Sequence, residues 1–310
     1  MTIYAWAMPR RYPRLPAPEV RLFEVAPDAR VLAKCHWQDA RSARPVLLLL
    51  HGLEGSADAH YMRGLAEKGL VAGFNVVRLN QRDCGGRLDL SEDTYHSGLT
   101  ADPIAVMREL ADRDGIERFG VAGYSLGGNL ALKLAGELGD RAPRLKAVAA
   151  VSPTLDLDAC VRAIERPVNR AYQENFLVSL RRRVRRKAAL YPSRFATDLL
   201  PGIRSIREFD ERYTSRLHGF GNASNYYDRA SSLRVVDRIR VPTFILTAQD
   251  DPFVPPDQFA DPAVTGNPHI RVVVTRHGGH CGFVAGHARG ASDRYWGEQA
   301  VVDFVAGHAG

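Results

Sequence analysis

The sequence predicts an α/β protein in which helices cover both faces of a mostly parallel central sheet, with a helical cap inserted between two late strands. The run Val46–Leu50 contains only valine and leucine, as in a strand that is buried on both faces. Strand-like stretches alternate with helix-like stretches along most of the chain. Residues 153–241 are the exception, since they are rich in arginine and aromatic residues and contain no clear strand.

Apolar alternation or continuous apolar runs mark the expected strands, and apolar steps of three or four mark the expected helices. Strands are expected at residues 19–25, 30–37, 45–50, 74–79, 118–122 and 145–151, then at 243–247 and 270–275. Helices are expected at residues 57–71, 102–113, 126–138 and 295–305. In the second of these, Ile104, Met107 and Leu110 recur at steps of three, and Pro103 suits a first helical turn.

The strandless stretch divides the expected fold. An insertion of that length between two sheet strands is typical of a cap or lid rather than of a loop. We therefore expect a core built from residues 1–152 and 242–310, with a helical cap at residues 153–241.

Composition is that of an ordinary globular protein, with 45% apolar and 25% charged residues among 310. No apolar run approaches the roughly 20 residues that span a bilayer, and the N-terminus has no pattern of a signal peptide. The four cysteines are widely spaced, which is unlike a disulfide scaffold or a zinc ribbon. These features favour a cytoplasmic protein, and they leave its oligomeric state open.

The net charge of +7 is local rather than global. Residues 175–197 carry seven basic side chains and no acid, so the rest of the chain is balanced. This disfavours general binding of nucleic acid. Leu177, Leu180, Val184, Ala188 and Tyr191 define one face of a helix, and we expect the arginines on the opposite face. That face, centred on 181–187, is either simply solvated or contacts an anionic membrane or an acidic partner.

A candidate nucleophile lies in the segment Gly123–Gly127, which matches G-x-S-x-G with Ser125 at its centre. The motif follows an expected strand and precedes an expected helix, which is the context that makes it specific. The serine sits on a strained turn, so the residues two positions away on either side must lack side chains. The alternative is a tight turn with serine as a helix N-cap.

Two main-chain amides are candidates for an oxyanion hole. The segment His51–Gly55 follows the most apolar strand, and in acyl-transfer enzymes of this build that loop supplies one amide. The residue after the nucleophile supplies the other. We therefore assign the donors to Leu53 and Leu126, and we expect His51 to stabilise the loop through ring hydrogen bonds.

A serine nucleophile needs an imidazole base and a carboxylate that orients it. Asp251 follows a strand end and is our choice for the acid, with the adjacent Asp250 as the alternative. For the base we choose His280, in a glycine-rich loop after the next strand, over His277 and His287. We expect no cofactor and no metal, because nucleotide motifs are missing and His277, His280 and Cys281 form a poor zinc ligand set.

Taken together, these motifs resemble the YheT-like branch of the α/β-hydrolase superfamily. The resemblance runs from about residue 20 to the C-terminus, and its five motifs occur in the expected order. Those motifs begin at His51, Tyr95, Gly123, Asp250 and His277, and segments 207–210 and 226–227 add to the likeness.

The resemblance implies an α/β-hydrolase fold, with Ser125, Asp251 and His280 as charge-relay residues and carboxylic-ester hydrolysis as the activity. We expect a small-molecule ester with a short, medium or lipid-like acyl group as substrate. Cap residues Phe176, Leu177, Phe195 and Phe220 are candidates for an acyl pocket, although most are expected to pack within the cap. The alternatives are a non-catalytic apolar-ligand-binding protein on this fold, or a membrane-associated lipase using its basic helix.

Overall fold

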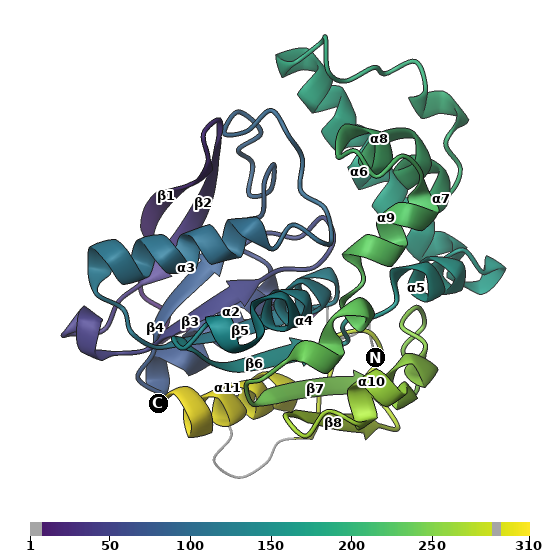
Figure 1. The fold of residues 1–310 in the computed structure, drawn as a ribbon. Helices are drawn as coiled ribbons and strands as arrows, with labels where there is room; N and C mark the ends of the chain where they lie inside the picture. The colour runs from purple at the N-terminus through teal and green to yellow at the C-terminus, as the bar shows by residue number, and fades with distance from the viewer. Residues whose placement is uncertain (1–7, 287–292) are drawn as a thin grey trace.

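The computed structural model describes residues 8–286 and 293–310 and contains one eight-stranded sheet, in the order β1-β2-β4-β3-β5-β6-β7-β8 (Figure 1). β1 pairs antiparallel with β2, and β2 pairs antiparallel with β4, while all later pairs are parallel. The strands are β1 (Glu19–Ala26), β2 (Ala29–His36), β3 (Val46–Leu50), β4 (Asn75–Leu79), β5 (Phe119–Tyr124), β6 (Leu145–Val151), β7 (Thr243–Ala248) and β8 (Ile270–Thr275). The mostly parallel sheet that the sequence predicts is confirmed.

Helices cover both faces of this sheet. On one face α3 (Ala101–Asp114) and α4 (Leu126–Leu138) pack against the strands, and on the other α2 (His60–Val71) and α11 (Trp296–Ala309) do so. The short helix α10 (Pro262–Thr265) lies between β7 and β8 in the chain. Figure 1 shows α3 and α4 in front of the sheet.

β3 shows why such a sheet needs an all-apolar strand. Val46, Leu48 and Leu50 belong to the core cluster on the α3 and α4 face, whereas Leu47 and Leu49 belong to the cluster on the α2 and α11 face. All five side chains are fully buried. Because successive side chains point to opposite faces, a central strand with two covered faces has no position for a polar residue.

The expected helix at residues 57–71 begins three residues late, at His60. A turn precedes it, in which the Ala59 amide donates to the Ser56 carbonyl at 3.1 Å. The Ala57 amide instead donates to the side chain of Asn80, 2.8 Å away. These local hydrogen bonds replace the first helical turn, and they fasten the loop after β3 to the end of β4.

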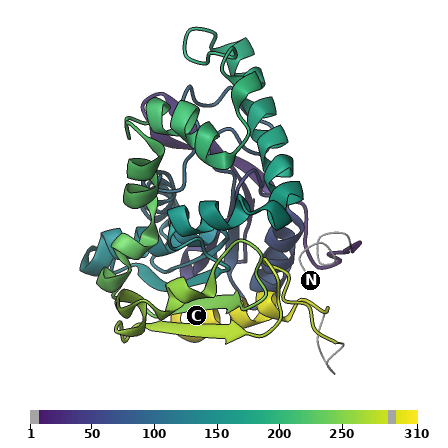
Figure 2. The same cartoon turned by 90° about the vertical axis from the view of Figure 1, so that its right-hand side faces the viewer.

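Between β6 and β7 the chain forms helices and turns, and residues 153–241 contain no strand. We refer to these residues as the cap segment. Its helices are α5 (Leu157–Ile164), α6 (Arg170–Leu190), α7 (Ile206–Phe209), α8 (Ser215–Leu217) and α9 (Ala223–Ala230). A π-helical turn, Asp210–Thr214, joins α7 to α8. Figure 2 shows the cap segment rising above the sheet, with the long α6 along its side.

The basic residues of α6 are distributed differently from the expectation. Leu177, Leu180 and Val184 are buried, as predicted. However, the arginine-rich run does not lie wholly on the opposite face, because Lys187 is fully buried and its Nζ lies 3.0 Å from the Asp83 carboxylate. The side chain of Arg183 is 10% exposed, and its Nη1 lies 2.9 Å from Glu54. Spacing alone missed this because a long basic side chain can reach a carboxylate on a different part of the fold.

Further contacts attach the C-terminal part of α6 and the turn after it to the loop after β4. The Lys187 ammonium also donates to the carbonyl oxygens of Ser91 and Leu88, and Arg194 forms an ion pair with Asp93. Burial lowers the pKa of Lys187 and raises that of Asp83 to about 6, in each case against the opposing influence of the partner charge. The two charges are therefore stabilised by their direct contact with each other, because neither group is well solvated.

We predict that Lys187→Met destabilises the fold. Removing one partner of a buried ion pair leaves the other charge uncompensated, which costs about 3–5 kcal/mol. Urea denaturation followed by circular dichroism measures this loss. Arg186→Met is the matched control, since Arg186 is exposed on the same helix and its loss should change stability by less than about 0.5 kcal/mol. Equal midpoints for the two variants would contradict the prediction.

Candidate active site

Ser125 occupies the turn between β5 and α4 in a conformation that L-residues rarely adopt, with φ 54° and ψ −120°. Its amide donates to the Val151 carbonyl at the end of β6, at 2.8 Å. Its carbonyl accepts the first hydrogen bond of α4 from the Asn129 amide, at 3.0 Å. The turn is therefore held from both sides, and the side chain of Ser125 is left half-buried on the cavity wall.

The glycines on either side of Ser125 are required by close backbone contact. A Cβ atom at Gly123 would lie 2.0 Å from the Gly127 carbonyl oxygen. One at Gly127 would lie 2.3 Å from the Leu50 carbonyl oxygen and 2.6 Å from that of His51. No L side chain fits at these distances. This is the steric requirement that the G-x-S-x-G motif predicts.

The loop after β3 lies directly against this turn. A Cβ atom at Gly52 would come within 3.3 Å of the Ser125 Cβ. The buried ring of His51 holds the loop, because Nδ1 lies 2.8 Å from the Gly52 carbonyl and Nε2 accepts from the Gln81 amide at 3.1 Å. Burial lowers the pKa of His51 to about 4, so the ring is neutral. The expected structural role of His51 is confirmed.

The amides of this loop differ in their hydrogen bonding. The Gly52 amide donates to the Tyr61 hydroxyl at 3.0 Å, and the Glu54 amide donates to the Tyr95 hydroxyl at 2.7 Å. The Gly55 amide donates to the Gly52 carbonyl. Within the described part of the chain, the Leu53 amide has no such acceptor.

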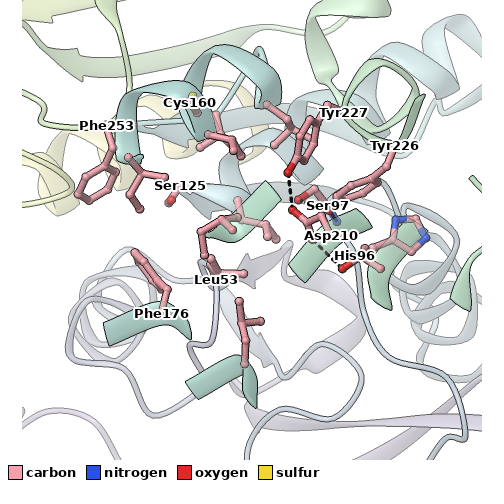
Figure 3. Close-up of a pocket in the computed structure, with 18 of the residues that line it drawn as sticks. Leu53, His96, Ser97, Ser125, Cys160, Phe176, Asp210, Tyr226, Tyr227 and Phe253 are labelled. Carbon is pink, nitrogen blue, oxygen red and sulfur yellow. Dashed lines mark hydrogen bonds between the residues drawn. The ribbon is translucent and has the colours of Figure 1, made fainter. Parts of the chain in front are cut away.

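Leu126, the other predicted donor, is the first residue of α4. The amides of a first helical turn have no acceptor within their own helix. Leu53 and Leu126 both line the cavity that contains Ser125. Figure 3 labels Leu53 and Ser125 in this cavity.

Asp251 and His280 meet after β7 and β8. The Nδ1 atom of His280 lies 2.9 Å from Oδ2 of Asp251, whose side chain is fully buried. The other carboxylate oxygen accepts from the amides of Phe253 and Val254, at 3.1 and 3.0 Å. Burial on its own disfavours a charged imidazole, but the Asp251 carboxylate outweighs it and, with Cys281, raises the pKa of His280.

The alternative residues have other positions. Asp250 accepts from the amides of Gly278 and Gly279, at 2.8 and 2.7 Å, and so fixes the loop that carries His280. His277 is largely exposed, with Nδ1 3.6 Å from the Asp250 carboxylate. His287 lies outside the described residues. Of the two candidate acids, it is therefore Asp251 that contacts His280.

Contacts link the His280 loop to the Ser125 turn. The Cys281 amide lies 3.3 Å from the Ser152 hydroxyl, immediately after the Val151 carbonyl that holds Ser125. The rings of His280 and Phe253 are 4.2 Å apart, and Phe253 lines the same cavity as Ser125. Ser125, Asp251 and His280 thus lie in loops that follow β5, β7 and β8, at the carboxyl ends of parallel strands, where ligands bind in open α/β sheets.

The cavity beside Ser125 has two different walls. An apolar wall comes mainly from the cap segment, and includes Leu157, Val161, Ile164, Phe176 and Phe253. On the other side is a wall of polar side chains, drawn at the right of Figure 3, which include His96, Ser97, Asp210, Tyr226 and Tyr227.

Of the four cap residues expected at an acyl pocket, only Phe176 lines this cavity. Leu177, Phe195 and Phe220 are buried in the core cluster instead, so packing is their role. Sequence reasoning did not single out Arg183 or Thr154, and it noted Asp210 and the tyrosines only as part of a resemblance. Asp210 lies in the mostly charged run Arg207–Arg212, so nothing in its sequence neighbourhood distinguishes it from the adjacent acids.

Among residues 8–286 and 293–310, no group of three or more His, Cys, Asp or Glu side chains could hold a metal ion. In the same residues, every helix is too short or too polar to cross a bilayer.

Residues 45–286 match the family model described as the alpha/beta hydrolase fold. The chain is 35% identical to "Putative esterase YheT" of Escherichia coli (strain K12), over 84% of this chain and 76% of that one. It is 32% identical to phospholipase ABHD3 of Bos taurus over 81% of this chain, and this match spans 61% of that longer protein.

Solved structures show the same fold at lower identity. The esterase Pf2001 of Pyrococcus furiosus superposes with a TM-score of 0.61 and 17% identity, over 94% of this chain and 93% of that one. The 2,6-dihydroxy-pseudo-oxynicotine hydrolase has a TM-score of 0.63 and 22% identity, over 96% and 70% of the two chains.

This chain is therefore a member of the α/β-hydrolase family, and within it belongs to the YheT-like branch. Together with the fold, the relatives identify it as a carboxylic ester hydrolase.

Proposed function

We propose that the protein hydrolyses a small-molecule carboxylic ester through an acyl-enzyme, with Ser125 as nucleophile, His280 as base and Asp251 as the residue that orients His280. The observation that carries this proposal is the Asp251–His280 hydrogen bond, in a loop packed against the strand end that holds the strained Ser125 turn. A purely structural turn would need neither the strain nor a buried carboxylate behind an imidazole.

The proposed reaction has two displacement steps. His280 takes the hydroxyl proton of Ser125 as its oxygen attacks the ester carbonyl, and the Leu53 and Leu126 amides stabilise the resulting oxyanion. The tetrahedral intermediate then collapses, the C–O bond to the alcohol breaks, and His280 returns the proton to the departing alcohol. Water, deprotonated by His280, attacks the acyl-enzyme, releases the carboxylic acid and restores Ser125.

The tautomer of His280 fits this role. When Nδ1–H donates to Asp251, Nε2 is the unprotonated ring nitrogen, which is the one that acts as a base. The carboxylate also stabilises the imidazolium that forms in each step.

We further propose that residues 153–241 act as a cap over a core formed by residues 1–152 and 242–310. The apolar wall that the cap segment contributes suits a short to medium or lipid-like acyl chain. Cys35, Cys84, Cys160 and Cys281 are free thiols, which suits the reducing cytoplasm, where we propose that the enzyme acts.

Replacing Ser125 tests the function. We expect Ser125→Ala to lose ester turnover by a factor of 10³ or more, because the nucleophile is removed. Hydrolysis of nitrophenyl esters of increasing chain length measures the activity, and labelling by a fluorophosphonate reports the nucleophile independently. Ser224→Ala is the control, and should keep both. A wild-type protein that stays unlabelled would instead favour a non-catalytic binder of apolar ligands on the same fold.

Replacing Asp251 tests the acid. We expect Asp251→Asn to lower kcat by roughly 10³–10⁴, because the imidazole loses its orientation and its stabilising charge. Only neutral His280 is a base, so activity rises as pH increases through the His280 pKa. Loss of the carboxylate that raises this pKa shifts the acid limb of the pH profile to lower pH.

Asp250→Asn is the matched control for this experiment. Asp250 holds the loop amides rather than the ring, so we expect a smaller loss and no shift of the limb. A shift with Asp250→Asn and none with Asp251→Asn would reverse the assignment.

We also propose a peripheral contact with anionic membranes through the outer face of α6. Arg182, Arg185 and Arg186 are exposed there, beside Val178 and Leu190, which are 54% and 50% exposed. Exposed basic and apolar side chains on one helix face are typical of membrane-surface helices.

Sedimentation with vesicles tests this contact. We expect the wild type to co-sediment with phosphatidylserine-containing vesicles more than with neutral ones, and changing the three arginines to glutamine should abolish the difference. Changing the exposed Arg108, Arg113 and Arg271 to glutamine is the charge-matched control. Equal recovery of the wild type on both vesicle types would remove the electrostatic contact.

A further inference from the structure

The polar wall of the cavity is built around Asp210. Its two carboxylate oxygens accept hydrogen bonds from Tyr227 at 2.8 Å and from Thr214 at 2.7 Å. A carboxylate has about four lone-pair positions, so these two bonds leave acceptor capacity on the cavity side. Beside it, Ser97 accepts a hydrogen bond from the Tyr226 hydroxyl at 3.0 Å, and its own hydroxyl proton is left to donate.

Donors on the same wall lack partners. Nη1 of Arg183 forms an ion pair with Glu54 at 2.9 Å. Its Nε has no hydrogen-bond acceptor among the described residues, although the side chain is nine-tenths buried. The buried Oγ1 of Thr154 has no partner there either. Both residues line the cavity. An unmade hydrogen bond of a buried polar group is costly, so such groups in a cavity wall indicate a polar ligand.

The charges near this wall do not favour an anion. Arg183 and Lys187 pair with Glu54 and Asp83. Arg207, the other base near Asp210, pairs with Asp158, so the charges around Asp210 leave no surplus cation. Desolvation raises the pKa of Asp210 to about 6, so its carboxylate is mostly charged at neutral pH.

The neighbouring imidazole adds no positive charge. Burial lowers the pKa of His96 to about 3, and the ring is therefore neutral. A phosphate would thus meet a wall with no excess of positive charge, whereas a hydroxyl group both accepts and donates.

We propose that this wall is a subsite for the hydroxyl groups of an uncharged ester, with one hydroxyl accepting from Arg183 and one donating to Asp210. The substrate class is then an ester that carries a vicinal diol near one end and an alkyl chain on the apolar wall. This inference rests on the proposed ester hydrolysis at Ser125, and it adds specificity-determining roles for Arg183 and Asp210.

Four esters of matched length test the subsite. Propyl octanoate is the reference, and glyceryl monooctanoate carries the diol on the alcohol. A propyl ester of octanoic acid with a terminal vicinal diol carries it on the acyl chain, and phosphopropyl octanoate carries an anion. We expect kcat/KM for one diol ester to exceed that for propyl octanoate by roughly tenfold to a hundredfold, as expected for hydrogen bonds to charged groups.

Variants connect that preference to the wall. We expect Asp210→Asn, which keeps the side-chain shape, and Arg183→Met each to reduce the ratio of kcat/KM between the preferred diol ester and propyl octanoate by about tenfold or more. Arg170→Met is the control, because Arg170 is exposed on the same helix and takes no part in the wall, and it should keep the ratio. The ratio is insensitive to a loss of folded enzyme, which lowers both rates equally. Thermal unfolding of each variant is recorded alongside.

Each outcome is decisive. A preference for either diol ester that Asp210→Asn abolishes supports the subsite and tells which half of the substrate it binds. A preference for the phosphate ester or for propyl octanoate, or equal kcat/KM for all four esters, overturns the subsite. Ester hydrolysis at Ser125 would still stand in each of these cases. Failure of the wild type to cleave any of the four, with no fluorophosphonate labelling, overturns the proposed function and this inference together.

Discussion

The backbone at the end of β3 presses against the turn that carries Ser125, and this contact sets the geometry of the site. Because Gly127 lies where any Cβ would meet the carbonyl oxygens of Leu50 and His51, strands β3 and β5 can end side by side with their loops in contact. Leu53, Ser125 and Leu126 then line one cavity. A methyl group added at Gly127 would push the Ser125 turn away from the loop after β3, although the two lie more than 70 residues apart in the chain.

Electrostatic contacts extend this arrangement to the cap segment. Arg183 and Lys187 reach from α6 to Glu54 and Asp83, which lie in loops after β3 and β4. The same loop after β3 carries the Leu53 amide, so the cap is attached beside the candidate oxyanion hole. Cap position and site geometry are therefore coupled through Glu54, whose amide is itself held by Tyr95.

The sequence predicts the core far better than it predicts the cap. β3 and the Ser125 turn are local features, since an all-apolar run and two glycines around a serine have few structural solutions. Asp251 rather than Asp250 contacts His280, and the role of Asp250 in holding the glycine amides could not be inferred from spacing.

The cap depends on long-range contacts instead. A helical pattern in α6 correctly places Leu180 and Val184 inside, but the pattern alone would place Lys187 in solvent. Its burial depends on Asp83, 104 residues away, and nothing in the sequence around Lys187 predicts that pairing. Arg183 and Asp210 likewise belong to the cavity wall only because several segments of the cap meet there.

The attachment of α6 has a consequence for engineering within this family. Exchange of caps between enzymes is a natural route to new specificity, because an insertion between two strands has both of its junctions close together. A cap transplanted from this protein would carry Arg183 and Lys187 but not their partners Glu54 and Asp83. In the new host, the two cations would be buried without a carboxylate to pair with them. The unit of exchange is therefore discontinuous, and it includes the two acidic loop positions along with the helices.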